Sequence, residues 1–275
     1  KPLFKGIRLT FIKDIVIYSS FVLLQMIATQ INSSVDQIMI GSLVKDSAII
    51  LGVYGVGTQI VQYFQSIGSA FTGVLMPGVV KLVENGAKSE ELMNEMIRIG
   101  RIIFMVLSLI WCGFVVNGKE FVALWAGKTN IQAYAVAVIL MFAYIFILTE
   151  SIGSQILWAM NRHKEQAILK VVLVLLNIVF TAMLIKWDPL IGATIGTFVS
   201  LVLGDIVVMN LIFKKKIGIN LKYYYSEIFK GISPCLLLTS IVGGFFAKLL
   251  PVGWAWLCLK IVIMMLAYGG TLLIF

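Results

Sequence analysis

Residues 129–149, TNIQAYAVAVILMFAYIFILT, form a run of twenty-one residues without a charged side chain. At ~1.5 Å of rise per residue, a helix of that length is about as long as the hydrocarbon core of a bilayer is thick. Runs of this length and composition predict membrane-spanning helices, because a span needs close to twenty predominantly apolar residues. Other charge-free runs cover residues 47–80, 102–118, 189–204, 231–247 and 261–275.

The composition of the whole chain agrees with this interpretation. Its 275 residues are 60% hydrophobic and 13% charged, with a mean hydropathy of +1.00. A soluble domain is closer to half apolar and a quarter charged. We therefore expect an all-α polytopic membrane protein with about eight spans. Allowing an occasional charge within a run, the expected spans are 15–44, 49–81, 97–117, 131–160, 166–185, 190–213, 232–250 and 253–275.

The basic residues alternate along the chain. Of the 22 Lys and Arg residues, sixteen lie before the first expected span or in every second connection after it, counting the ends of the flanking spans with each connection. Five lie in the other connections counted in the same way, and Lys260 lies inside the last span. Membrane proteins concentrate Lys and Arg in cytoplasmic segments. The pattern predicts that both ends of the chain face the cytoplasm, and it explains the net charge of +9 without nucleic-acid binding.

Polar residues follow one face of the first expected span. Gln25, Thr29, Asn32 and Asp36 are spaced by four, three and four residues, which stacks them on one side of a helix. Lipid-facing residues should be apolar, so this face should meet protein or water, and an ionisable group there indicates a functional site. The alternative is that amides and hydroxyls only join helices. Counted from Asp14, Asp36 lies about 33 Å along the helix, toward the outer half of the membrane.

Further polar residues occur in other spans. The second expected span carries Thr58 and Gln62, and the fourth carries Glu150 and Gln155 near its cytoplasmic end. Together with the polar face of the first span, we expect these four residues to line a cleft through which a substrate or an ion passes. Asp205, in the sixth span, is expected near the cytoplasmic headgroups. The fifth span contains Asn177 and Thr181.

Small residues recur every four positions in the sixth expected span, at Gly192, Gly196, Ser200 and Gly204. Small side chains at this spacing let two membrane helices approach closely. The spacing therefore favours a helix-packing face over a substrate contact.

The sequence contains no HExxH, P-loop or GxSxG motif and no long loop that could form a catalytic pocket outside the membrane. Its three cysteines show no CxxC spacing, which argues against a metal site. We therefore expect no catalytic residues, no bound metal and no organic cofactor.

Three stretches of the sequence, taken together and in order, resemble a known protein family. They are INSSVDQIMIGSLVKDSAIILGVYGVGTQI (31–60), GKEFVALWAGKTNIQAY (118–134), and the segment 155–200, which contains QILWAMNRHKEQAILKVVLVLLNIVFTAMLI and LIGATIGTFVS. In this order they resemble the polysaccharide flippases of the multidrug/oligosaccharidyl-lipid/polysaccharide exporter superfamily. The resemblance covers roughly residues 15–213.

The resemblance implies two six-helix bundles related by pseudo-symmetry, often followed by two extra helices. Residues 15–213 would be the second bundle, with a polysaccharide-biosynthesis C-terminal-like region from about 118. Residues 1–14 would be a cytoplasmic lead-in, 214–230 a basic and aromatic cytoplasmic connection, and 231–275 the extra pair. Because the chain begins with Lys1 rather than Met, we expect it to be the C-terminal half of a longer transporter.

The implied activity is to move an undecaprenyl-pyrophosphate-linked oligosaccharide across the bacterial inner membrane by alternating access, for O-antigen or capsule synthesis. The expected partners are the lipid-linked saccharide, membrane lipids and other polysaccharide-assembly proteins. Two alternatives remain open: a cation-coupled multidrug exporter of the same superfamily, and a membrane-embedded glycan polymerase or ligase.

Two details of the resemblance concern charge. Related multidrug antiporters place a coupling aspartate in a helix of the form VD-x-[IM]-[IM]-x-G, and VDQIMIG has that form at Asp36. A coupling cation, H⁺ or Na⁺, would then act at this residue. Flippases of this kind are thought to have a cationic cleft for the pyrophosphate. This chain departs from that pattern, because the cations near its spans are chiefly Lys260 and Lys186.

Overall fold

The computed structural model describes residues 9–45 and 47–274. Of the residues it describes, 88% are helical and none lies in a strand, so the predicted all-α class is confirmed. The first eight residues of the expected lead-in 1–14 lie outside the described residues. Residues 9–14 already belong to the first helix.

Thirteen helical elements follow one another along the described residues. The long helices are α1 (Leu9–Leu43), α2 (Ala48–Glu84), α3 (Ser89–Trp125), α4 (Ala133–Thr149), α6 (His163–Leu184), α7 (Pro189–Leu201), α10 (Ile232–Leu249) and α11 (Trp254–Leu272). The short ones are the 3₁₀-helix η1 (Lys128–Asn130), α5 (Ser151–Ala159), the π-helix η2 (Val202–Val208), α8 (Met209–Lys216) and α9 (Leu221–Phe229).

Seven helices among the described residues are long and apolar enough to cross a membrane, and an eighth span results when α4 and α5 are counted together. This agrees with a multi-pass membrane protein of about eight spans. The third span is longer than predicted, since α3 continues as one helix beyond both ends of 97–117. The fourth span is bent by 42° at Glu150, between α4 and α5. Hydropathy alone does not reveal such a bend.

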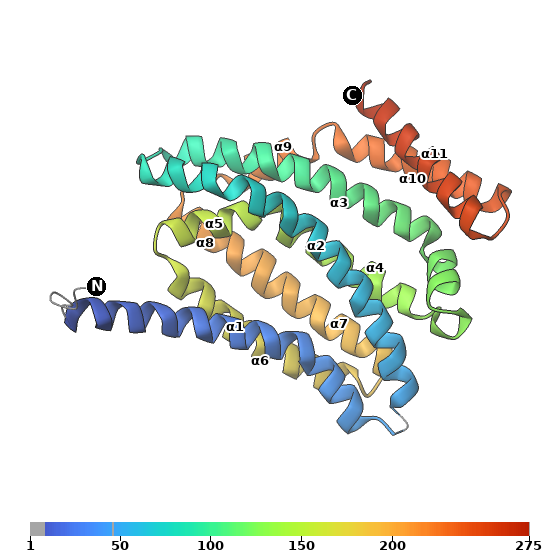
Figure 1. Ribbon diagram of the computed structural model, residues 1–275, viewed down its shortest axis with the longest axis horizontal. Coiled ribbons are helices and arrows are strands. Elements are labelled where there is room, and N and C mark those ends of the chain that lie inside the picture. The colour runs from blue at the N-terminus through green and yellow to red at the C-terminus, as the bar shows by residue number, and fades with distance from the viewer. Residues whose placement is uncertain (1–8, 46, 275) are drawn as a thin grey trace, which may run out of the picture.

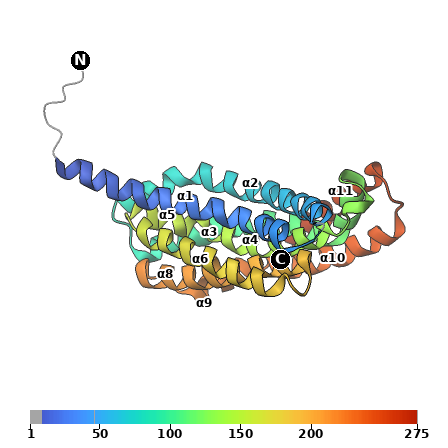
Figure 2. The same cartoon turned by 90° about the horizontal axis from the view of Figure 1, so that it is seen from below.

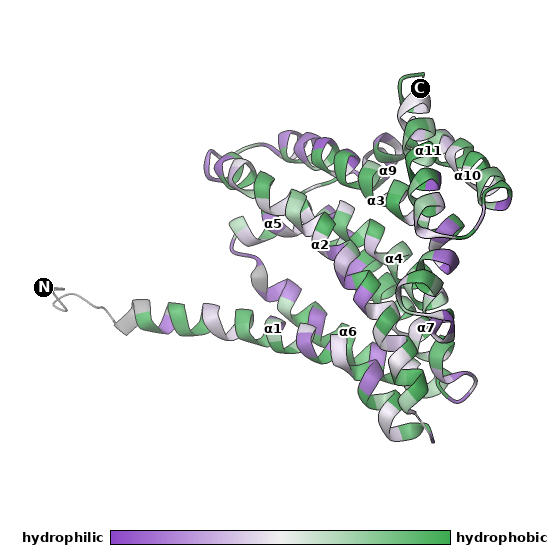
Figure 3. Ribbon diagram, turned by 45° about the vertical axis from the view of Figure 1, so that its right-hand side comes forward, coloured by the Kyte–Doolittle hydropathy of each residue, from purple (hydrophilic) through white to green (hydrophobic). Residues whose placement is uncertain are grey.

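The long helices run side by side in one bundle (Figures 1 and 2). The main apolar core includes Val61 of α2, Ile103 of α3 and Leu140 of α4. Helix α1 lies along α6, with Ala28 and Val35 packed against Val174. Helices α10 and α11 form a hairpin against α3. Hydrophobic residues make up most of the long helices, and hydrophilic residues gather in the connections and at a few helical turns (Figure 3).

Glycines permit an unusually close approach of α7 to α6. A Cβ atom added to Gly196 would lie 2.5 Å from the Thr181 hydroxyl oxygen and 2.7 Å from its backbone nitrogen. One added to Gly192 would collide with the Leu184 carbonyl group. Gly204, in η2, would bring a Cβ to 3.0 Å from Leu173 of α6. Ser200 is buried and donates its hydroxyl to the Thr197 carbonyl. The three glycines of the small-residue series thus lie against α6.

A buried ion pair joins the α10–α11 hairpin to α3. The Lys260 ammonium group lies 2.6 Å from the Glu120 carboxylate and also donates to the Pro251 carbonyl at 3.2 Å. The other Glu120 oxygen accepts the Gly253 backbone N–H at 3.0 Å. Lys260 is 1% exposed. The Lys260 charge therefore pairs with Glu120 and helps to hold the α10–α11 hairpin against α3.

We expect Lys260→Met to lower the free energy of unfolding by about 3–5 kcal/mol, because it leaves the Glu120 carboxylate without its ionic partner. The double variant Lys260→Met/Glu120→Leu should recover much of that loss, since no unpaired charge remains. Chemical unfolding of the purified full-length protein measures both. Lys248→Met, at an exposed lysine on α10, is the control. A loss in the double variant as large as in Lys260→Met would contradict the role of charge pairing.

Candidate functional site

A buried carboxylate lies where α1, α2, α6 and α7 meet. Asp36 of α1 is 3% exposed. Its oxygens accept the Tyr54 hydroxyl of α2 at 2.5 Å, the Thr181 hydroxyl of α6 at 3.0 Å, and the Thr197 hydroxyl of α7. Hydrogen bonds to an ionised acceptor are about twice as strong as those between neutral groups. The hydrogen bonds from these three helices therefore favour the ionised form of Asp36, against the cost of burying a charge.

Asn177 of α6 lies beside the two threonines. Its side-chain oxygen is 3.0 Å from the Thr181 hydroxyl and 3.1 Å from the Thr197 hydroxyl. Its side-chain nitrogen donates to Asn32 at 3.1 Å. A hydroxyl group carries one proton, so each threonine donates either to Asp36 or to Asn177. This Asp36 cluster (Asp36, Tyr54, Asn177, Thr181 and Thr197) therefore has more than one arrangement of its hydroxyl protons.

A separate polar cavity of about 220 Å³ lies among α1, the α4–α5 bend, α6 and the η2–α8 segment. It brings together three of the predicted cleft residues, Gln25, Glu150 and Gln155. Its other lining residues are Ile147, Ser154, Trp158, Gln166, Leu169, Lys170, Asp205, Met209 and Phe213.

Glu150 lies at the bend of the fourth span and is 2% exposed. Its Oε1 atom accepts the Asn210 side-chain N–H at 2.8 Å and the Tyr225 hydroxyl. Its Oε2 atom is buried and has no hydrogen-bond partner among the described residues, and the same is true of Gln25 Oε1. Buried polar atoms normally have a partner. The cavity thus has two buried acceptor oxygens that a ligand with O–H or N–H groups, or a cation, could satisfy.

An ion pair also lines this cavity. Lys170 of α6 donates to both Asp205 oxygens at 2.7 Å. Asp205 belongs to the π-helix η2 and is 8% exposed. Short π-helical segments inside α-helices are frequent at functional sites. The Asp205 carboxylate is buried against Lys170, and its place near the cytoplasmic headgroups stays a prediction.

The other predicted cleft residues belong neither to the Asp36 cluster nor to the lining of the polar cavity. Thr29 is exposed, and its hydroxyl donates to the Gln25 carbonyl within α1. Thr58 is partly buried and donates to carbonyls of its own helix. Gln62 is exposed on α2. The first-span face is thus divided: Asp36 belongs to the Asp36 cluster, Asn32 contacts Asn177 of that cluster, Gln25 lines the polar cavity, and Thr29 lines neither. The polar cavity contains three of the eight predicted residues, and a single cleft lined by all eight stays a prediction.

Several site residues were missed by sequence reasoning. Tyr54 is one aromatic residue among many in the apolar helices, and its position in the sequence does not indicate a carboxylate partner. Thr197 directly follows Gly196, and that adjacency to a close-packing glycine is a signal that could have identified it. Lys170 was counted among the basic residues of a connection, although it lies within α6 and pairs with Asp205.

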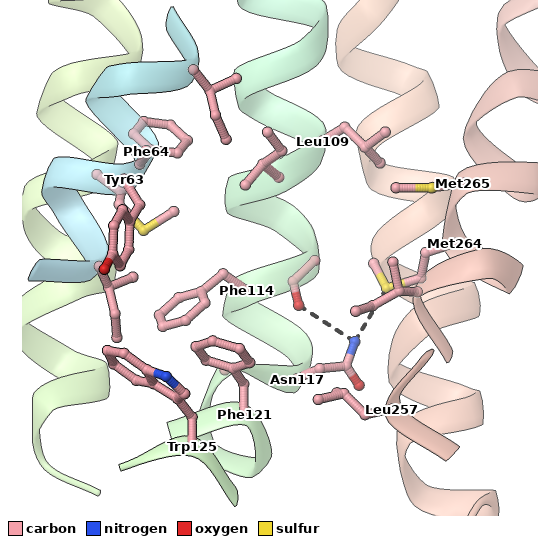
Figure 4. A pocket seen from close by; sticks show the side chains of 17 residues that line it. Tyr63, Phe64, Leu109, Phe114, Asn117, Phe121, Trp125, Leu257, Met264 and Met265 are labelled. Carbon is pink, nitrogen blue, oxygen red and sulfur yellow. Dashed lines mark hydrogen bonds between the residues drawn. The ribbon is translucent and has the colours of Figure 1, made fainter. Parts of the chain in front are cut away.

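A larger and almost wholly apolar pocket of about 400 Å³ lies between α2, α3 and α11 (Figure 4). Aromatic side chains, among them Tyr63, Phe114 and Trp125, line one side, and Met264 and Met265 line the other. Asn117 supplies a polar group. Its amide donates to the Gly113 carbonyl at 3.4 Å and lies 3.3 Å from the Met264 sulfur.

Fold and interior together define a helical membrane protein with ionisable groups buried between its spans, an arrangement typical of transporters. Among the described residues no group of three or more His, Cys, Asp or Glu side chains could hold a metal ion. The polysaccharide biosynthesis protein family matches residues 3–130. The match covers just under half of the chain, and over these residues it supports the predicted resemblance to proteins of polysaccharide assembly. Comparisons with curated proteins and with solved structures gave no significant match.

Proposed function

We propose that this chain is the second lobe, with two additional helices, of a flippase for lipid-linked oligosaccharides. The flippase would move an undecaprenyl-pyrophosphate-linked oligosaccharide across the bacterial inner membrane by alternating access. The observation that carries the proposal is the buried Asp36 cluster in a chain whose residues 3–130 match polysaccharide biosynthesis proteins. A carboxylate inside a membrane bundle is costly, and such groups usually serve an ion or substrate path. The substrate crosses unchanged, so no covalent step is involved.

Asp36 is the residue at which a coupling cation, H⁺ or Na⁺, would act. When Asp36 is ionised and unoccupied, it accepts the hydroxyls of Tyr54, Thr181 and Thr197. When a cation neutralises it, the threonine hydroxyls are free to turn to the Asn177 oxygen, which already lies within hydrogen-bond distance. These side chains belong to four helices, so cation occupancy changes contacts among all four. A cation with unequal affinity for two arrangements shifts the balance between them.

The two cavities suit the two chemical parts of a lipid-linked saccharide. Sugar hydroxyls are donors, which Glu150 Oε2 and Gln25 Oε1 lack, and Trp158 offers an aromatic surface on the same cavity. The apolar pocket matches the hydrocarbon character of a segment of prenyl chain. The two cavities have no lining residue in common, so each would contact its own part of the substrate.

One observation favours the second candidate, a cation-coupled multidrug exporter. The polar cavity contains two carboxylates and one lysine, and the apolar pocket is rich in aromatic residues. Lys260 is paired with Glu120, and neither it nor Lys186 lines the polar cavity. A pyrophosphate needs cations, which the first lobe of the transporter would supply in our proposal.

The alternation of basic residues supports an orientation with the N-terminal end of α1 and the C-terminal end of α11 at the cytoplasmic face. The proposed partners are the lipid-linked saccharide, membrane lipids and other proteins of polysaccharide assembly.

The test uses a bacterium whose own full-length gene for this protein is deleted. We expect loss of surface polysaccharide and accumulation of the lipid-linked saccharide in the cytoplasmic leaflet, both reversed by the full-length protein. A polymerase or ligase would instead leave the saccharide accumulated in the outer leaflet. Unchanged polysaccharide with increased sensitivity to drugs would identify an exporter. Either of these two results would overturn the proposal.

A further inference from the structure

Helix α9 is a short amphipathic helix between two spans. Its N-terminus is capped by Asn220, whose side chain accepts the Tyr223 N–H at 3.2 Å. Tyr224 and Ile228 are buried, whereas Lys222 and Tyr223 are exposed. The preceding span ends at Lys216 and the next begins at Ile232. Because one span exits and the next enters at the same membrane surface, α9 must lie at that surface.

The buried side of α9 holds the bend of the fourth span. The Tyr224 hydroxyl donates to the Thr149 carbonyl at 3.1 Å, and the Tyr225 hydroxyl donates to Glu150 Oε1. Burial raises the pKa of Tyr225, so its phenol keeps the proton that it donates. These two contacts meet the last residue of α4 and the residue at the 42° bend itself. Gly100 of α3 makes room for them, since a Cβ there would lie 3.0 Å from the Tyr224 hydroxyl oxygen.

The C-terminal end of α9 is also fixed to the bundle. Arg101 of α3 donates to the Glu227 carbonyl at 2.6 Å and to the Lys230 carbonyl at 3.3 Å. The Phe229 ring packs edge-on against Phe104 and Phe146, with centroids at 5.1 and 6.3 Å. Movement of α9 away from the bundle would therefore break the contacts that hold the bend.

The exposed side of this region is basic. Lys214, Lys215, Lys216 and Lys222 are all exposed around the turn between α8 and α9. A wide, shallow cavity of about 630 Å³ lies at this turn, lined by Lys214, Lys222 and residues 218–221. Neither Lys214 nor Lys222 has an ion-pair partner among the described residues, whereas Lys216 lies 3.5 Å from Glu165. Two unpaired ammonium groups beside one cavity at a membrane surface suit a phosphate group carried by a lipid.

We propose that the turn between α8 and α9 binds the headgroups of anionic phospholipids through Lys214 and Lys222, and that this binding holds α9 against the bend at Glu150. Juxtamembrane lysines interact favourably with anionic lipid surfaces. Because the coupling of two sites is reciprocal, the tyrosine contacts at the bend should in turn strengthen lipid binding at the turn. The fourth span would then be more rigid in an anionic membrane than in a neutral one.

Hydrogen exchange of the full-length protein in vesicles tests the proposal. One set of vesicles is phosphatidylcholine, and the other is a three-to-one mixture of phosphatidylcholine and phosphatidylglycerol. We expect amides of residues 145–155 and of α9 to exchange roughly fivefold to thirtyfold more slowly with phosphatidylglycerol, from the usual contribution of two lysines. Lys214→Gln/Lys222→Gln should lose this difference. Lys81→Gln/Lys88→Gln, at one exposed lysine in the last turn of α2 and one just before α3, should retain it.

Tyr225→Phe separates lipid binding from its effect on the bend. This variant keeps both lysines but loses the hydroxyl that donates to Glu150. Amides of residues 145–155 should therefore exchange faster in both vesicles and respond less to phosphatidylglycerol. An unchanged response in Tyr225→Phe would overturn the coupling to the bend. An unchanged response in Lys214→Gln/Lys222→Gln would overturn the lipid site. Slower exchange on adding inorganic phosphate to phosphatidylcholine vesicles would identify a site for free phosphate and likewise overturn the proposal.

Discussion

Replacing Asp36 with Asn is expected to reduce surface polysaccharide to roughly a tenth or less, with the protein still present in the membrane. The amide has nearly the same shape as the carboxylate but cannot bind a coupling cation by charge. It also loses hydrogen bonds to a charged group, each worth about 1.5–3 kcal/mol, which corresponds to about tenfold or more in an equilibrium. Complementation of the deletion strain, with immunoblots of membrane fractions, measures both quantities.

Two further variants complete the Asp36 experiment. Asp36→Glu keeps the charge on a longer side chain and should restore part of the activity. Glu84→Gln removes an exposed carboxylate at the end of α2, far along the helix from Tyr54, and should leave the polysaccharide unchanged. Normal polysaccharide in Asp36→Asn would remove this residue from the mechanism.

Replacing Gly196 with Val should cost about 3 kcal/mol or more of unfolding free energy. A Cβ at this position would lie within 2.5–2.8 Å of the Thr181 hydroxyl, backbone nitrogen and Cα. Two of these three atoms belong to the backbone, so α7 has to move away from α6. That movement also separates Thr197 from Asp36, so we expect activity to fall together with stability. Chemical unfolding in detergent and the complementation assay provide the two measurements.

Gly73→Val is the matched control for this substitution. Gly73 also lies inside a helix, and a Cβ there would meet nothing within 4 Å. Its free energy of unfolding should change by no more than about 0.5 kcal/mol. Similar losses in the two variants would show that glycine-to-valine substitution in a helix, rather than the α6–α7 contact, causes the effect.

The spans could be predicted because each is a local property of the sequence. A run of apolar residues indicates a membrane span whatever the distant parts of the chain contact. Helices were found at all eight expected places. The bend at Glu150 could not be predicted in this way. The two residues at the bend contact Tyr224 and Tyr225, which lie some 75 residues away along the chain and outside any local pattern. The segment 214–230 was recognised as a basic and aromatic connection, whereas two of its three tyrosines, Tyr224 and Tyr225, contact the bend inside the bundle.

The candidate site was predictable in part for a similar reason. Asp36 stands out because a carboxylate in a membrane helix is rare. Its partner Thr197 lies 161 residues away, and a threonine in a membrane helix commonly bonds its own backbone, as Thr29 does. Helical spacing placed Thr29 and Asp36 on one broad face, but it could not show which part of that face meets α6.

The central claim, cation-coupled translocation through Asp36, is tested most directly in proteoliposomes that contain the full-length protein. The measurement is the initial rate of transfer of the lipid-linked saccharide between leaflets, under an imposed H⁺ or Na⁺ gradient and without one. We predict that the wild-type rate rises with one of the two gradients and that Asp36→Asn shows a low rate that neither gradient changes. A gradient-dependent rate in Asp36→Asn equal to that of the wild type would contradict the account.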